Sequence, residues 1–238
     1  MKKVVSLLIT AAILTGCQTT NNTEVSSLKS EIEKLKKNQR QIAIQVGLGE
    51  LVRPEKISLS ADGIWIGSQD APLVMIEYTD LNCPFCKKFQ QETWPSFKEK
   101  FVDTNQVAVL ARELPLASLH PKAPFAAVML RCANQQGKYE PVKETLFELG
   151  NSLQQSDITE IVTNNSMDQE AFDRCVKDQN VHSIVTKSIN EAAQLGLSST
   201  PSFIIGQRKN DVIENYQIVS GAASIEQFEI AVKQVVEQ

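Results

Sequence analysis

The sequence of 238 residues has few of the features that indicate a metal site, a repeat protein or a membrane-spanning protein. It contains two histidines, His120 and His182, and one Cys-x-x-Cys motif, so no second motif is present that could complete a zinc site. No internal repeat is visible, and the apolar stretch at residues 4–14 is too short to span a bilayer as a stable helix. The hydrophobic content of 42% is ordinary for a globular protein.

Residues 1–16 have the pattern of an export signal, with two lysines, a short apolar stretch and small residues before Cys17. The ending Leu-Thr-Gly-Cys resembles the lipobox of bacterial lipoproteins, which implies that Cys17 is acylated and becomes the first mature residue. A cleaved signal followed by a chance cysteine is the alternative. We expect a lipid anchor on the periplasmic side of a bacterial cell envelope, at the outer membrane because Gln18 rather than Asp follows the cysteine.

Positive charge is also scarce, with 24 Lys and Arg residues against 28 Asp and Glu residues. Cleavage after residue 16 would remove Lys2 and Lys3 and no acidic residue, which leaves 22 basic against 28 acidic side chains and a net charge of −6. Such a protein is a poor partner for the nucleic-acid phosphate backbone. We therefore expect no nucleic-acid binding.

Residues 17–50 are expected to hold the lipid anchor, a polar tether and a helical coiled-coil stalk. Apolar residues recur at heptad a and d positions, with Gln39 as the one interruption. This apolar seam consists of Val25, Leu28, Ile32, Leu35, Ile42 and Val46. About three heptads are marginal as an isolated helix, so residues 25–46 predict a homo-oligomer, a dimer or a trimer. One amphipathic helix that packs on its own domain is the alternative.

Residues 58–238 have the pattern of an α/β domain, in which a helical block at about 117–196 interrupts a smaller core. Helix 84–101 is expected to bend or break at Pro95. The expected strands are 63–67, 73–79, 107–113, 202–205 and 215–220. The other expected helices are 124–136, 141–153, 157–164, 168–177, 181–195 and 224–236.

The motif Cys83-Pro84-Phe85-Cys86 carries the clearest chemical information. It follows an apolar, β-prone run and opens a helix, and Pro84 suits the first helical turn. Cys83 is then near the N-cap, where unpaired amides and the helix dipole favour the thiolate that attacks disulfides. The motif predicts thiol–disulfide exchange at an exposed, labile Cys83–Cys86 pair. Half of a metal site and a short structural disulfide are the alternatives.

A longer set of residues resembles the DsbA family of thioredoxin-fold thiol–disulfide oxidoreductases. The resemblance extends over about residues 63–236 and implies a thioredoxin fold with a helical insertion. It rests on Glu77-Tyr78-Thr79-Asp80-Leu81-Asn82-Cys83-Pro84-Phe85-Cys86-Lys87-Lys88-Phe89 and on Thr200-Pro201-Ser202-Phe203.

The resemblance implies a role for each residue of the expected site. Cys83 matches the nucleophilic cysteine and Cys86 the resolving cysteine. Pro201 matches a cis-proline beside the pair, which would expose the backbone of Thr200 to an extended substrate segment. Glu77 matches a buried acidic residue whose pKa would be raised and which could relay protons to or from Cys86. Pro84 and Phe85, between the cysteines, are expected to contact the substrate.

Phe85 is the main departure from the family pattern, because DsbA has a histidine there that helps to stabilise the thiolate. Phe85 cannot donate a hydrogen bond, so we expect weaker oxidising power. Thr200 before the proline is shared with the disulfide isomerase branch, and an oligomerising stalk is similar to that of oligomeric isomerases. These features favour an isomerase or reductase, and a DsbA-type oxidase is the alternative.

The expected substrates are exported proteins with thiols or disulfides, and a membrane or periplasmic redox partner would reset the cysteine pair. No cofactor or metal is expected. From another class of function, the alternative is a non-catalytic coiled-coil lipoprotein or a module that binds copper through Cys83 and Cys86.

Cys132 and Cys175 lie in expected helices of the insertion, among apolar neighbours at helical spacing. Several DsbA-like proteins have a second disulfide, and the resemblance implies one here. It would close a loop of 44 residues (175 − 132 + 1) and act as a structural crosslink. Two buried free thiols are the alternative.

Overall fold

The computed structural model describes residues 21–237, and it divides them into one unit that ends at Val52 and another that begins at Arg53. Cys17 and the expected signal peptide lie outside the described residues. Within residues 21–237, no helix combines the length and the apolar character needed to cross a membrane.

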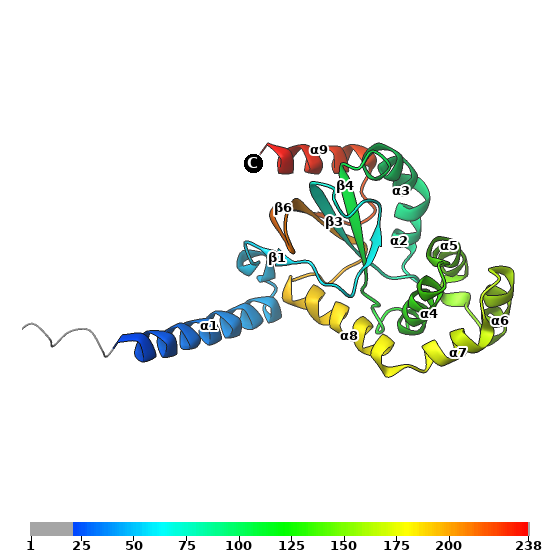
Figure 1. Ribbon diagram of the computed structural model, residues 1–238, viewed down its shortest axis with the longest axis horizontal. Helices are drawn as coiled ribbons and strands as arrows, with labels where there is room; N and C mark the ends of the chain where they lie inside the picture. The colour runs from blue at the N-terminus through cyan, green and yellow to red at the C-terminus, as the bar shows by residue number, and fades with distance from the viewer. Residues whose placement is uncertain (1–20, 238) are drawn as a thin grey trace, which may run out of the picture. The chain divides into compact units, whose positions relative to one another are not determined.

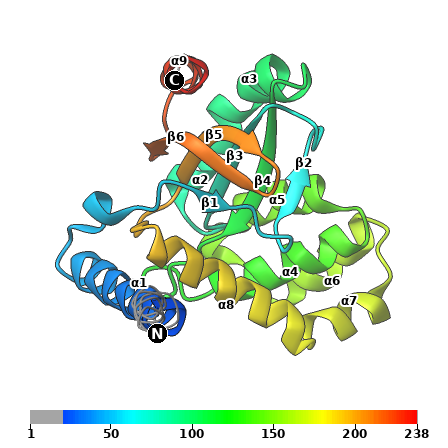
Figure 2. The ribbon, with the colours of Figure 1, turned by 60° about the vertical axis from the view of Figure 1, so that its left-hand side comes forward.

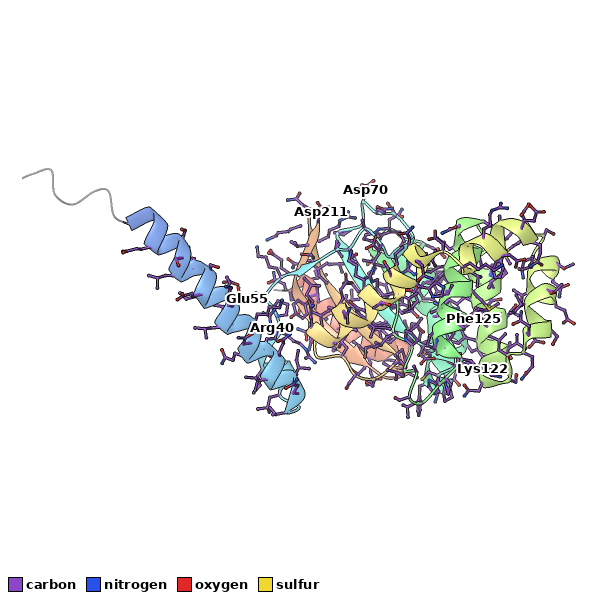
Figure 3. All side chains as sticks on the ribbon, turned by 90° about the horizontal axis from the view of Figure 1, so that it is seen from below. Arg40, Glu55, Asp70, Lys122, Phe125 and Asp211 are labelled. Carbon is purple, nitrogen blue, oxygen red and sulfur yellow. A yellow bond between two sulfur atoms is a disulfide. The ribbon has the colours of Figure 1, made fainter. Side chains whose placement is uncertain are left out.

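The first unit contains helix α1 (Asn21–Gln45) and the short 3-10 helix η1 (Gly49–Val52). After α1, Gly47 adopts a φ of +78°, a left-handed conformation that favours glycine at the end of a helix. Arg40, labelled in Figure 3, donates from Nε to the carbonyl of Val52 at 2.9 Å. The side chains of the apolar seam are exposed, from 43% at Val25 to 66% at Leu35.

The second unit is built on a six-stranded sheet with the strand order β1-β6-β5-β3-β4-β2 (Figure 1). Strands β3 and β4 are parallel, and every other neighbouring pair is antiparallel. Strands β3 and β4 are buried along their full length, which explains their largely apolar sequences, and Glu77, Arg112 and Glu113 are their buried charged residues. The strands are β1 (Ile57–Ser58), β2 (Ile64–Ile66), β3 (Leu73–Thr79), β4 (Val107–Glu113), β5 (Ser202–Lys209) and β6 (Val212–Ser220).

Helices cover both faces of this sheet (Figure 2). On one face, helices α3 (Trp94–Phe97) and α9 (Ile225–Val236) contribute aromatic side chains to a core with Met75 and Phe203. On the other face, α8 (Gln179–Gln194) packs Ala192 against a core that includes Val74 and Ile204. The α/β thioredoxin-like fold and its helical insertion are confirmed.

The insertion contains four further helices besides α8, which are α4 (Ala123–Gln135), α5 (Tyr139–Leu149), α6 (Gln155–Asn164) and α7 (Gln169–Val176). A short 3-10 helix, η4 (Gly150–Ser152), follows α5. Phe125, labelled in Figure 3, packs against their shared core. A disulfide joins Cys132 on α4 to Cys175 on α7, with the two Cα atoms 5.7 Å apart. The expected crosslink is therefore present.

The helical segment after the cysteine motif departs from the expectation at one point. It runs through α2 (Pro84–Lys88), the π-helical η2 (Phe89–Thr93), α3 and the π-helical η3 (Lys98–Val102). The α-helix is interrupted before Pro95 and not at it. The Trp94 N–H donates to the carbonyl of Phe89, five residues back, which makes a π-helical turn. This wide turn directly precedes the proline, which has no N–H of its own to donate.

Two features of the sheet were missed from the sequence. Strand β1 has only two residues, too few for an alternating pattern. Strands β5 and β6 extend to a hairpin turn at Asn210, whose φ is +55°, because Arg208 and Lys209 pair with β6 despite their polar side chains.

We predict that replacing both Cys132 and Cys175 by alanine lowers the free energy of unfolding by about 2–5 kcal/mol, because the crosslink restricts a loop of 44 residues in the unfolded chain. Urea unfolding of the oxidised proteins measures the difference. Equal midpoints and slopes for the parent and the double variant would contradict a stabilising disulfide.

Candidate functional site

The loop between β3 and α2 positions the two cysteines. Cys83 is the N-cap of α2, with extended backbone angles of φ −79° and ψ 123°, and Pro84 occupies the first turn. Cys86 then lies one turn into the helix and is buried. The expected placement of Cys83 at a helix N-terminus is confirmed, and both cysteines are free thiols.

Strand β5 begins next to these thiols, although it is more than 100 residues away in the sequence. The Cys83 thiol donates to the carbonyl oxygen of Thr200, with an Sγ to O distance of 3.4 Å. The peptide bond between Thr200 and Pro201 is cis, as the resemblance implied. Among the described residues the Thr200 hydroxyl is buried with no other hydrogen-bond partner, so it can donate to Cys83 when the thiol ionises.

Hydrogen bonds lower the pKa of Cys83 to about 5. The largest contribution comes from the Cys86 thiol, and Thr200 and the backbone N–H groups of Phe85 and Cys86 add to it against the opposing effect of burial. Burial raises the pKa of Cys86 well above its ordinary value, and the interaction with Cys83 acts in the same direction. The pair thus has one nucleophile and one proton-holding partner.

The expectation that the pair is exposed is wrong. Cys83 is 5% exposed and Cys86 is 1% exposed, because both belong to the buried core that the helical insertion forms and Cys83 also contacts the carbonyl of Thr200. The exposed part of the motif is Phe85, at 61%, together with Pro84. Thr200 itself is 7% exposed, and its carbonyl faces the Cys83 sulfur.

Glu77 is buried, as expected, but the sequence did not indicate its ion-pair partner. Lys143 on α5 approaches both carboxylate oxygens, with its Nζ at 3.1 and 3.3 Å. Burial is the largest effect and acts to lower the pKa of Lys143, but the charge and hydrogen bond of Glu77 together with the charges of Tyr139 and Glu140 outweigh it, so the net pKa is raised. The ammonium also lies over the rings of Trp94, at 5.7 Å, and Tyr139, at 5.5 Å.

Asp80 and His120 were also missed as parts of the site. The backbone N–H of Asp80 donates to Cys86 Sγ at 3.5 Å, and its carboxylate lies 2.8 Å from His120 Nδ1. The available sequence information was a carboxylate three residues before Cys83 and a histidine in a loop. Nothing in their spacing of 40 residues indicated that they meet.

No group of three or more His, Cys, Asp or Glu side chains in the described part of the chain is arranged to hold a metal ion. The fold and the site together define a thioredoxin-fold protein with a buried dithiol at a helix N-terminus. The thioredoxin family model matches residues 59–231, and the chain belongs to this family.

Two known proteins are similar to this chain over part of its length. The chain is 26% identical over 156 residues to the Na(+)/H(+) antiporter NhaA 3 of Salinispora tropica, a match over 66% of this chain and 23% of the antiporter. The chain thus spans about a quarter of that relative. A Rickettsia bellii protein named as a protein-disulfide oxidoreductase is 23% identical over 167 residues, which cover 68% of this chain and 62% of that protein.

Solved structures show the same fold. The crystal structure of Wolbachia pipientis alpha-DsbA1 superposes with a TM-score of 0.64 at 23% sequence identity. The superposition covers 79% of this chain and 95% of the Wolbachia chain. The fold is therefore DsbA-like.

We predict that the alkylation rate of Cys83 in the reduced protein rises with pH around a midpoint of about 5. The pKa is lowered, so between pH 5 and 9 the group is a thiolate where an ordinary thiol would stay protonated. Replacing Cys86 by alanine removes the main hydrogen-bond donor and should move the midpoint upward. Cys86→Ser, which keeps a donor, should restore part of the shift, and a parent midpoint near 9 would contradict the assignment.

Proposed function

We propose that the protein is a thiol–disulfide oxidoreductase of the DsbA type that acts on exported proteins. The observation that carries the proposal is the division of roles within the pair, in which the pKa of Cys83 is lowered to about 5 while that of Cys86 is raised. A nucleophile that is ionised at neutral pH, beside a second thiol that keeps its proton, suits two successive exchange steps.

In the reductive direction, the Cys83 thiolate attacks a substrate disulfide. A bond forms between Cys83 and one substrate sulfur, and the other substrate sulfur leaves as a thiolate. Cys86 then loses its proton and attacks the Cys83 sulfur, which forms the Cys83–Cys86 disulfide and releases the reduced substrate. The same steps in reverse oxidise a substrate dithiol.

Glu77 is the proposed proton relay to Cys86. The high pKa of Cys86 means that its attack requires a proton acceptor. Glu77 is buried on the strand that leads to the motif, but its hydrogen bonds go to Lys143 and none joins it to Cys86 within the described residues. The relay therefore requires a water molecule or a rearrangement of the ion pair.

Substrate binding is proposed at the exposed end of the motif. Phe85 offers an apolar ring at 61% exposure, next to the exposed Pro84. An extended substrate segment would pair with the backbone at Thr200 when the Cys83 thiol releases its carbonyl.

We favour isomerase or reductase action over strong oxidation. Phe85 supplies a backbone N–H to the Cys83 thiolate and its side chain supplies no donor, which limits the stability of the reduced form. A DsbA-type oxidase is the second candidate, and the lowered pKa of Cys83 favours it.

The proposal has three further parts. The protein is anchored through Cys17, it lies on the periplasmic side of the outer membrane, and a membrane or periplasmic redox partner resets the cysteine pair. The apolar seam of α1 supports oligomerisation through residues 25–46, because its side chains are exposed in a single chain.

We predict that Cys86→Ala, expressed in the cell envelope, accumulates mixed disulfides between Cys83 and exported proteins, because the resolving thiol is gone. Non-reducing electrophoresis followed by mass spectrometry identifies the trapped partners. The Cys83→Ala, Cys86→Ala double variant is the matched control and should trap none. Absence of trapped partners in the single variant would contradict the proposed function.

We predict that deleting residues 18–50 leaves the dithiol titration unchanged but dissociates the oligomer and slows the refolding of a scrambled disulfide substrate. Sedimentation velocity measures the assembly. Leu28→Asp with Leu35→Asp should act like the deletion, whereas Lys29→Asp, outside the seam, should not. Unchanged assembly and refolding would contradict the oligomeric isomerase.

The copper-binding alternative is tested on the same purified protein. Bound copper without insulin-reducing turnover would favour the binding module, and turnover without copper would favour the oxidoreductase.

A further inference from the structure

The backbone of Asp80 makes hydrogen bonds to both active-site cysteines. Its backbone N–H donates to Cys86 Sγ at 3.5 Å, and its carbonyl accepts from the backbone N–H of Cys83 at 3.0 Å. A displacement of this one peptide segment would therefore change the environment of both sulfurs.

The Asp80 side chain is fixed from two directions. The carboxylate is fully buried, and Oδ1 accepts from the backbone N–H of Asn82 at 2.8 Å. Oδ2 accepts from the backbone N–H of Leu116 at 2.8 Å and lies 2.8 Å from Nδ1 of His120. The carboxylate thus joins the loop before Cys83 to the loop after β4.

His120 is the titratable member of this arrangement. An ionised carboxylate only accepts hydrogen bonds, so Nδ1 of His120 carries the hydrogen. Its side chain is 14% exposed, and within residues 21–237 its other ring nitrogen has no hydrogen-bond partner and can take up a proton.

Within the described residues, Asp80 is the charged side chain that contacts the His120 ring. The backbone of Asp80 in turn bonds Cys83 and Cys86, whose thiols are the other titratable groups on this side. Lys122, labelled in Figure 3, is near in sequence, but its Nζ donates to the carbonyl of Leu153 at 2.6 Å.

We infer that His120 is a positioning residue for the dithiol, which acts through the Asp80 carboxylate to hold the backbone against Cys83 and Cys86 and thereby stabilises the reduced pair. This inference rests on the dithiol chemistry proposed above. Within the described residues, loss of the contact would leave Asp80 Oδ2 with the backbone N–H of Leu116 as its hydrogen-bond donor.

The test compares His120→Ala, His120→Asn and His182→Ala, each as the full chain. Alanine removes the donor, whereas asparagine places an amide nitrogen close to the position of Nδ1. His182 is the matched control, because its ring bonds the carbonyl of Val176 within the insertion. Two quantities are measured, the alkylation midpoint of Cys83 and the equilibrium constant of the Cys83–Cys86 pair with glutathione.

We predict that His120→Ala raises the midpoint by about one pH unit and shifts the glutathione equilibrium about tenfold toward the disulfide form, which corresponds to about 30 mV for a two-electron couple. His120→Asn should recover most of both changes, and His182→Ala should cause neither. Unchanged values in His120→Ala would overturn the inference, and so would a change in either His120→Asn or His182→Ala as large as that in His120→Ala.

A measurement on the parent protein decides the matter if His120→Ala does not fold. Because coupling is reciprocal, the titration of the His120 ring, followed by NMR, should have a higher midpoint in the reduced than in the oxidised protein. Equal midpoints would overturn the inference. Neither experiment uses a protein substrate, so a failure here is distinct from a failure to trap substrates.

Discussion

The rest of the site depends on one constraint, which is that a thiolate must be stable at a sulfur that water scarcely reaches. Removing a charge from water is costly unless hydrogen bonds replace the lost hydration. Around Cys83 these come from the Cys86 thiol, the start of α2 and Thr200, and together they outweigh burial. The burial that makes ionisation costly also strengthens each of these hydrogen bonds.

The fold brings the donors together from distant parts of the chain. Parallel pairing of β3 with β4 sets the end of β3 beside the loop that contains His120, and antiparallel pairing of β3 with β5 sets Thr200 beside Cys83. The insertion adds Lys143, whose ion pair with Glu77 attaches α5 beneath the motif. The buried carboxylates in this core thus each have a side-chain partner, Asp80 the His120 ring and Glu77 the Lys143 ammonium, and such partners make buried charges tolerable.

The sequence predicted those features that depend on local pattern. The ranges of β3 and β4 follow from largely apolar, β-prone runs, and the N-cap position of Cys83 follows from the proline beside it. The pairing of Cys132 with Cys175 and the cis bond at Pro201 were implied by the family resemblance. The partners of Glu77 and Asp80 could not be predicted, because they lie 66 and 40 residues away and only tertiary packing brings them into contact. The burial of the cysteines was misjudged for the same reason, since they pack into a core with residues of the helical insertion.

The most direct test of a stabilised Cys83 thiolate is the reduction potential of the Cys83–Cys86 pair at equilibrium with glutathione. A thiol pKa of about 5 lies between about 7 for thioredoxin and about 3.5 for DsbA. We therefore expect a potential between the values of those two proteins, about −270 and −120 mV. A value below about −300 mV, typical of a structural disulfide, would contradict a reduced form stabilised by this thiolate.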